Sequence, residues 1–351
     1  MQNINKIKNL INSEYAYLMA EHDNWSLLSG PKSSELVAHA LRVILHAGDV
    51  KRNEAEWLAV VNVQNEEGAW GGESDNPTSA PWASAFLALM LIRGNAILKN
   101  NKISKSIEQS IDFFIKDQKA DGRWVDPAWA DLDTTSHPVS LFNVVLAIGE
   151  PKWKKKVLKS WQAGLKFITD NQNPDGSWVD PNFHPTGVET TAHLVQDSVI
   201  AALCFPDRNL LAPHQGDLKE VCHKGMEKLL TFQAANGSYD DENMDHTMDS
   251  TRSLIIISKV LHTEKKCADA IEKAMDWVNE FKCQPAGWPD FPGMKVNLER
   301  TCDGLDVLMK YLAWREKDWK PSVRRWGYVT GIPSFKGLKR PTKKQLSLAK
   351  V

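Results

Sequence analysis

Apolar residues recur along most of this chain at the three- and four-residue spacing that predicts amphipathic helices. Two examples are the sets Ile107, Ile111, Phe114, Ile115 and Leu158, Trp161, Leu165, Ile168. Other segments, such as 86–92 and 199–205, are apolar on nearly every side, which is typical of buried helices. No segment shows a clear two-residue alternation of a β-strand. The pattern therefore predicts an all-α protein with amphipathic outer helices and more apolar inner ones.

The N-terminal residues 1–20 alternate apolar side chains with Lys and Asn at helical spacing, which indicates an amphipathic helix and not a signal peptide. The longest apolar segments are far shorter than the roughly 20 residues that cross a bilayer. We therefore expect no transmembrane segment and at most a peripheral contact with a membrane.

A short pattern of Gln, polar residues, Gly and an aromatic residue returns five times. The copies are Gln64-Gly68-Trp70, Gln118-Gly122-Trp124, Gln172-Gly176-Trp178, Gln233-Gly237-Tyr239 and Gln284-Gly287-Trp288. Successive Gln residues are 54, 54, 61 and 51 positions apart. Each copy follows an amphipathic segment, and its Gly suits the left-handed turn in which helices often end. Each copy therefore marks the end of an outer helix.

A second signal, an acid or Pro followed by two small or polar residues, precedes each of the more apolar segments. Its copies are Pro77-Thr78-Ser79, Asp133-Thr134-Thr135, Glu189-Thr190-Thr191, Asp249-Ser250-Thr251 and Glu299-Arg300-Thr301. A helix pair every 50 to 60 residues predicts either an open solenoid or a closed ring of hairpins. With an N-terminal inner helix at 34–46 the chain holds about six pairs, so we predict a closed (α/α)6 barrel over residues 1–351, although periodicity alone does not distinguish the two.

Composition narrows the classes of partner. The 43 Lys and Arg residues nearly cancel the 44 Asp and Glu residues, so no overall charge favours nucleic acid. The five Cys residues contain no C-x-x-C pair, which argues against a disulfide framework and a zinc cluster and favours the cytoplasm. No dinucleotide, P-loop or His-Glu-x-x-His motif is present, so we expect no cofactor and no metal.

The five repeats, over roughly residues 55–290, resemble the QW motifs of squalene-hopene cyclases and related class II terpene cyclases. Residues 131–136 resemble the acid motif of that family, in the Asp-x-Asp-Thr-Thr form of some bacterial members. The resemblance implies a cyclase that protonates a polyprenyl chain with Asp133. The chain has room for one helical domain, so it is similar to the monodomain form represented by cyanobacterial merosterolic acid synthase. Thr134 stands where many members carry a third acid.

The chemistry of the acid pair is consistent with that role. Glu189, Asp249 and Glu299 share the repeat position of Asp133 and are explained by helix capping. The second acid, Asp131, is more than capping requires. Because burial and a like-charged neighbour both raise a carboxyl pKa, we expect Asp131 and Asp133 to hold one proton between them.

Other candidate residues surround this acid. The hydroxyls of Thr134 and Thr135 could stabilise the conjugate base. His137 and His193 each follow an acid by four residues, so either could orient Asp133, and an adjacent helix favours His193 slightly. Carbocations must be kept from water, so we expect an apolar cavity with aromatic faces, which stabilise a nearby cation. The candidates for this lining are Trp82, Phe86, Trp129, Phe142, Phe183 and Phe291. We expect the Trp residues of the repeats to brace the ends of outer helices instead.

The C-terminal tail, at about 313–351, is rich in aromatic residues. It could cap the pocket, bringing Arg324 or Arg325 to an acidic head group, or strap the outer helices; we favour the cap. The expected partner is a lipophilic polyprenyl molecule, with a prenylated aromatic acid favoured over a free prenyl diphosphate.

Three other functions are weighed against cyclisation. A protein prenyltransferase β subunit would need an Asp-x-Cys zinc ligand pair, which is absent. A glycosidase would need two carboxylates on different elements, which two acids in one tripeptide fit poorly. A non-catalytic isoprenoid-binding barrel remains open.

Overall fold

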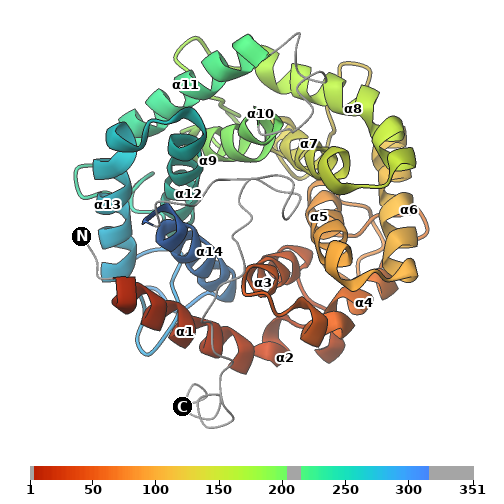
Figure 1. Ribbon diagram of the computed structural model, residues 1–351, viewed down its shortest axis with the longest axis horizontal. Helices are drawn as coiled ribbons and strands as arrows, with labels where there is room; N and C mark the ends of the chain where they lie inside the picture. Colours follow the sequence, from red (N-terminus) through yellow and green to blue (C-terminus); the bar gives the residue numbers. More distant parts are fainter. Residues whose placement is uncertain (1–3, 204–214, 316–351) are drawn as a thin grey trace.

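A computed structural model describes residues 4–203 and 215–315. Within them, six inner helical segments stand around a common centre (Figure 1). Five are single helices: α3 (Ser34–His46), α5 (Pro81–Leu98), α7 (Asp131–Ile148), α12 (Met244–Leu261) and α14 (Leu298–Arg315). The sixth is composite and consists of α9 (Val188–His193), a π-helical segment (Leu194–Ile200) and α10 (Ala201–Leu203).

The outer helices surround this inner ring and alternate with it along the chain (Figure 1). They are α1 (Ile4–Ala20), α2 (His22–Trp25), α4 (Glu54–Asn62), α6 (Asn101–Asp117), α8 (Pro151–Asp170), α11 (Gln215–Phe232) and α13 (Glu264–Glu280). Short 3-10 turns follow α2 and precede α4, at Leu27–Ser29 and Val50–Asn53. The described residues contain isolated β-bridges but no strand, so the predicted all-α class is confirmed.

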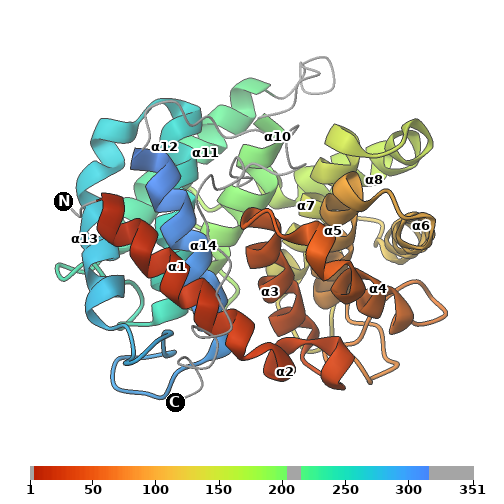
Figure 2. The same cartoon turned by 60° about the horizontal axis from the view of Figure 1, so that its bottom comes forward.

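The ring is closed, which settles the choice between a barrel and a solenoid. Helix α14 packs on both α1 and α3, so the last described helix meets the first inner and outer ones (Figure 2). At the same seam the backbone N–H of Gly287 donates to Glu14 Oε2 of α1 at 2.7 Å. The predicted (α/α)6 barrel is therefore confirmed.

The Gln-Gly-aromatic repeats link neighbouring helix pairs. The side-chain amide of Gln118 donates to the carbonyl of Gly122, 2.8 Å away, and to that of Ser160 on the next outer helix, 2.9 Å away. The buried indole of Trp124 donates to the carbonyl of Phe114 at the end of α6 (2.9 Å). Gln64, Gln172 and Gln233 bond in the same way. The repeat Trp residues thus brace outer helix ends, as predicted.

The repeat glycines are required by the close approach of the next outer helix. Gly68 has φ of +88°, and a Cβ atom there would lie 2.6 Å from the backbone oxygen of Gln109 on α6. A side chain at this position would therefore separate two adjacent helix pairs.

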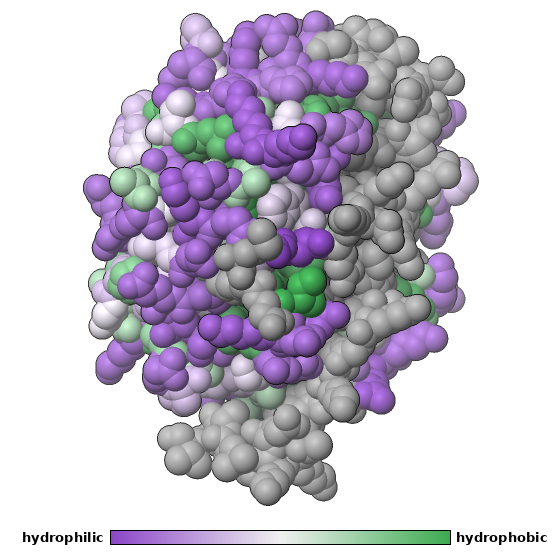
Figure 3. Space-filling model, turned by 60° about the vertical axis from the view of Figure 1, so that its left-hand side comes forward, coloured by the Kyte–Doolittle hydropathy of each residue, from purple (hydrophilic) through white to green (hydrophobic). Residues whose placement is uncertain are grey.

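On the face of the barrel drawn in Figure 3, the coloured surface is mainly hydrophilic, with scattered apolar side chains. Of the described helices, α5 alone is long and apolar enough to cross a membrane. Because α5 is an inner barrel helix and most of it is buried, its composition is explained by the core. Most of the tail expected to cap the pocket lies outside the described residues.

Candidate active site

A pocket lies at the end of the barrel where the inner helices begin. Its walls are formed by side chains from the first turns of these helices and from the turns below. The lining comprises Glu35, His39, Arg42, Trp82, Phe86, Leu89, Met90, Arg93, Trp129, Asp133, His137, Ser140, Glu189, His193, Asp197, Asp245, Asp249, Arg252 and Arg300. Most of these side chains are ionisable, whereas an apolar cavity was expected.

Equivalent positions of the repeat build this pocket in two layers. In each of five repeats the backbone N–H of the aromatic residue donates to a hydroxyl of the following inner helix, at 2.8 to 3.4 Å. These hydroxyls belong to Ser84, Thr135, Thr191, Thr247 and Thr301. The residues two positions before these hydroxyls, together with Glu35 on α3, form a set that we call the first-turn ring: Glu35, Trp82, Asp133, Glu189, Asp245 and Glu299. The residues two positions after the hydroxyls, together with His39 on α3, form the second-turn ring: His39, Phe86, His137, His193, Asp249 and Asp303.

These rings correct the register of the second repeat signal. Asp249 was aligned with Asp133, but Thr247 is the residue that bonds Tyr239, so Asp245 is the counterpart of Asp133. Asp249 instead corresponds to His137 and His193. Pro77 is likewise replaced by Trp82 as the first-turn residue of α5. The sequence pattern was ambiguous because a Thr lies two residues after each of the acids Asp245 and Asp249 of α12.

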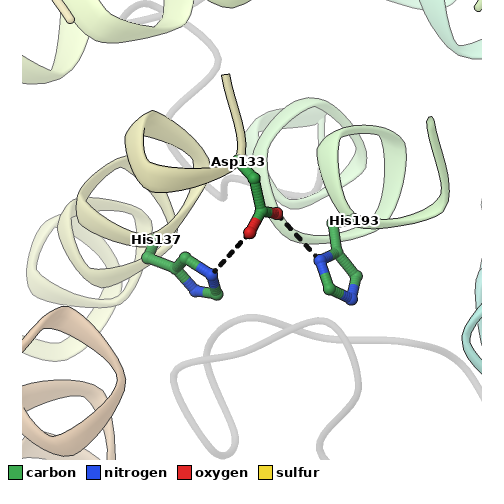
Figure 4. Close-up of side chains that lie close together, drawn as sticks. All are labelled: Asp133, His137 and His193. Atoms are coloured by element: carbon green, nitrogen blue, oxygen red, sulfur yellow. Dashed lines mark hydrogen bonds and ion pairs between the residues drawn. The ribbon is translucent and has the colours of Figure 1, made fainter. Parts of the chain in front are cut away.

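Asp133 lies at the centre of a hydrogen-bonded group on the pocket wall (Figure 4). Its side chain is 3% exposed. Oδ1 is 2.9 Å from Nδ1 of His193 on the neighbouring inner helix, and Oδ2 is 3.6 Å from Nε2 of His137 on the same helix. Oδ2 also accepts from the indole N–H of Trp129 at 2.5 Å. Both histidines therefore contact Asp133, and His193 makes the shorter contact.

His193 bridges two carboxylates. Its Nδ1 faces Asp133, while its Nε2 contacts Asp249, which in turn pairs with Arg252. Burial lowers the pKa of His193, but Asp249 and Asp133 outweigh it and hold that pKa well above its usual range. Burial raises the pKa of Asp133, but hydrogen bonds from His137 and His193 outweigh it and hold that pKa well below its usual range. A shared proton therefore lies mainly on His193.

The expected sharing of a proton between Asp131 and Asp133 is wrong. The carboxylate of Asp131 is one-third exposed, pairs with Nη1 of Arg123 at 2.8 Å, and does not line the pocket. Residues two apart on a helix point in different directions, so Asp131 leaves the face that Asp133 occupies. The like-charged neighbour that was to raise the pKa of Asp133 is thus replaced by two histidines that lower it.

The two threonines of the motif do not contact the acid either. The hydroxyl of Thr135 accepts from the N–H of Trp124 at 3.1 Å and donates to its carbonyl oxygen at 3.3 Å. The hydroxyl of Thr134 is buried without a hydrogen-bond partner among the described residues. The residues within hydrogen-bond distance of the Asp133 carboxylate are instead His193 and Trp129.

Three of the six candidate aromatic residues line the pocket, namely Trp82, Phe86 and Trp129. Trp82 and Trp129 lie with ring centroids 6.0 Å apart. The other three do not line it. Phe142 is buried in the core, Phe183 is 44% exposed against the outer side of Trp129, and Phe291 is 38% exposed. The loop or helix that carries each of these residues could be predicted from the sequence, but the direction in which its side chain points could not.

Glu189 forms a second hydrogen-bonded group beside the first. Its Oε2 is 2.8 Å from both Nδ1 of His184 and Nε2 of His246, and His246 also contacts Asp240 at 2.6 Å. Burial raises the pKa of Glu189, but the two histidines outweigh it and lower that pKa. Sequence reasoning missed this group because His184 and His246 lie in a loop and in another repeat.

Three of the arginines that line the pocket are paired with carboxylates. Arg252 contacts Asp249 and lies 3.0 Å from Asp306, and Arg300 contacts Asp245. Arg42 is 2.6 Å from Asp303. Arg324 and Arg325, which were expected at the head group, lie outside the described residues.

No family model matches the sequence, and no curated protein matches it. Similar solved structures include a polysaccharide lyase, at 10% identity and a TM-score of 0.63, with 90% of this chain and 98% of that chain covered. The type II terpene cyclase MstE from Scytonema, solved with its substrate geranylgeranyl dihydroxybenzoate, aligns at 13% identity and 0.60, over 89% and 99%. The ent-copalyl diphosphate synthase from Streptomyces platensis aligns at 14% identity and 0.53, over 80% of this chain and 50% of that one. Class II terpene cyclases thus stand beside other barrel enzymes among the similar structures.

Proposed function

We propose that this protein is a class II terpene cyclase that protonates a linear polyprenyl chain, favouring a prenylated aromatic acid as substrate. The observation that carries the proposal is Asp133, a buried acid at the start of an inner helix, facing the pocket with a proton-bearing His193 behind it. MstE, which was solved with its substrate geranylgeranyl dihydroxybenzoate, has a similar fold and supports the choice of substrate.

The number of protons that the two contacts of His193 require explains how Asp133 can act as an acid. An ionised carboxylate only accepts hydrogen bonds, so the contacts of His193 with Asp133 and Asp249 need two protons. Nε2–H serves Asp249, and the second proton lies between Nδ1 and Asp133. This proton passes through Asp133 to the terminal alkene, leaving a carbocation and a carboxylate that accepts from Trp129.

The pocket has an apolar wall for the polyene. Trp82, Phe86 and Trp129 lie with Leu89 and Met90 on the side of α5 and α7, and Asp133 lies at the edge of this wall. Aromatic faces stabilise a nearby cation by about 0.5–2 kcal/mol. The opposite side carries the charged groups of α12 and α14, which suit a polar head group.

Product analysis tests the proposal. Purified full-length protein is incubated with geranylgeranyl dihydroxybenzoate and, separately, with geranylgeranyl diphosphate, each with and without EDTA. We expect a cyclised isomer of the first substrate, formed equally well in EDTA. Cyclisation of the diphosphate alone, lost in EDTA and restored by Mg²⁺, would favour a prenyl diphosphate cyclase. Recovery of tightly bound but unchanged isoprenoid would favour a binding barrel.

A second candidate is an enzyme that acts on an acidic saccharide. The observation in its favour is the first-turn ring, where Asp133 and Glu189 are carboxylates on different helices of one pocket, as glycoside hydrolysis requires. Release of reducing ends from an unsaturated glucuronyl disaccharide, with no conversion of either prenyl substrate, would establish this candidate and refute the cyclase.

A further inference from the structure

A cyclisation that Asp133 starts also needs a base to end it. A cyclised isomer contains the same atoms as its substrate, so the proton that Asp133 adds must be matched by one that leaves the final carbocation. A group on the pocket wall has to take this proton. The pocket has five acids besides Asp133 on its wall: Glu35, Glu189, Asp197, Asp245 and Asp249.

These five acids differ in what holds them. Glu189, Asp245 and Asp249 are each contacted by histidine or arginine side chains. Glu35 lies in the first turn, at the mouth of the pocket, and its side chain is 39% exposed. The carboxylate of Asp197 has no cationic nitrogen of the described residues within 4 Å, and its one hydrogen bond among them comes from the side-chain amide of Gln196 at 2.7 Å.

The inner helix that carries Asp197 turns this side chain toward the pocket. From Val188 to Ile200 every residue is buried except His193 and Asp197, and both of these line the pocket. They are four positions apart and therefore lie about one turn apart on the same face of the helix. Asp197 thus lies one turn further into the barrel than the histidine that contacts Asp133.

The π-helical segment determines that a carboxylate stands at this place. Counted from the hydroxyl that bonds the repeat aromatic residue, the fifth residue lines the pocket in α7 and α12, namely Ser140 and Arg252. In the helix of Asp197 the fifth residue is Gln196, which is buried and does not line the pocket, and the sixth is Asp197. Because a π-turn holds one residue more than an α-turn, it shifts the register by one and replaces an amide with a carboxylate.

Side chains of the two neighbouring inner helices hold this π-turn. The buried amide of Asn143 on α7 donates to the backbone carbonyls of Asp197 and Ser198, both at 3.1 Å. The side-chain carbonyl of Gln196 accepts from Nε of Arg252 at 3.2 Å, so its NH₂ group is turned toward Oδ1 of Asp197. An amide donates a hydrogen bond but keeps its proton, so this contact leaves Asp197 able to accept one.

We propose that Asp197 is the base that ends the cyclisation, an assignment that rests on the proposed function. Its carboxylate takes a proton from a carbon next to the final carbocation. The electron pair of the broken C–H bond becomes the second bond of a new alkene, which neutralises the cation. One proton has then entered through Asp133 and one has left to Asp197. Before the next turnover Asp197 gives its proton to water and His193 regains one from water.

The test is the product profile of folded variants with geranylgeranyl dihydroxybenzoate as substrate. Asp197→Asn keeps the shape of the side chain but cannot take a proton. We expect this variant still to consume substrate, while the fraction released as the cyclised isomer falls at least about tenfold. Alcohols, formed when water adds to the cation, should take the place of the isomer. Asp197→Ser is a second variant with the same expected result, and Asp217→Asn, an exposed acid of α11, is the control that should give wild-type products.

An unchanged fraction of isomer in both folded Asp197 variants would overturn the assignment. So would a complete loss of substrate consumption in them, because the base acts only after Asp133 has delivered its proton. A changed product in Glu35→Gln together with an unchanged one in Asp197→Asn would locate the base at the mouth instead. If the wild type itself forms no cyclised product, the proposed function fails and the assignment with it, a result that differs from each of the others.

Discussion

At the scale of single residues, only Asp133 of the acid motif faces the pocket, whereas Asp131, Thr134 and Thr135 contact other parts of the protein or none. Asp133 faces the pocket, whereas Asp131 turns outward to Arg123. We therefore expect Asp131→Asn to keep most of the activity and to lose about 0.2–1 kcal/mol of unfolding free energy, as for other partly exposed ion pairs. The shared proton that the sequence predicted would instead make this substitution nearly as damaging as one at Asp133. Turnover and urea unfolding of Asp131→Asn decide between the two, and a near-complete loss of turnover would restore the paired-acid mechanism.

The adjacent threonines offer a matched pair of substitutions. Thr135→Val leaves the buried N–H of Trp124 without its acceptor, which should cost about 1–3 kcal/mol. Thr134→Val removes a buried hydroxyl that has no partner among the described residues, so its free energy of unfolding should stay unchanged or rise. Urea denaturation of both variants measures the difference, and equal losses would contradict these assignments.

At the scale of helices and turns, the repeat predicts most of what the structure contains. The Gln-Gly-aromatic signal marks the ends of outer helices because its hydrogen bonds are local or reach the next outer helix. The second signal was less informative, because a first-turn acid and a second-turn acid look alike in sequence. The direction of Asp131 and Phe142 depends on how each inner helix is rotated against its neighbours, which no local pattern specifies.

Two glycines separate backbone strain from close packing. Gly68 and Gly48 both have positive φ, of +88° and +74°, so Ala is strained at either. A Cβ atom at Gly48 would meet nothing within 4 Å, whereas at Gly68 it would lie 2.6 Å from the Gln109 oxygen. We expect Gly68→Ala to lose about 1–3 kcal/mol more than Gly48→Ala. Equal melting temperatures for the two variants would show that the repeat glycine serves conformation alone.

At the scale of the whole molecule, buried histidines couple stability to pH. His184, His193 and His246 all have a raised pKa in the fold because carboxylates outweigh the effect of burial. Such groups stabilise the protein fully below their unfolded pKa of about 6.5 and lose this contribution as the pH rises through the folded pKa. The free energy of unfolding should therefore fall as the pH rises above about 6.5.

The slope of this fall identifies the group responsible. Urea unfolding between pH 6 and pH 9 should give a shallower decline in His193→Gln than in the wild type. If the two declines are equal, the proton attributed to His193 is not held there. The same proton supplies the proposed chemistry, so turnover should decline over the same pH range as stability does.

The barrel itself could be predicted from the sequence because it consists of six similar helix pairs. Each pair can bury its apolar face only by packing against neighbouring pairs. Its closure depended on α14 meeting α1 and α3, and on Glu14 reaching Gly287, contacts between the two ends of the described chain that no repeat encodes. The pocket was predicted to be apolar and aromatic, yet half of it is charged. The first-turn ring explains these charged groups. An acid at the start of a helix is usually explained by capping, but at the start of an inner barrel helix its side chain faces the pocket.

The measurement that tests the central claim most directly compares the wild type with Asp133→Asn on geranylgeranyl dihydroxybenzoate. The amide keeps the shape of the side chain but cannot pass a proton from His193 to an alkene. We predict a cyclised isomer from the wild type and none from an Asp133→Asn variant whose circular dichroism and melting temperature show it to be folded. Cyclisation by that folded variant at a rate near that of the wild type would contradict the account.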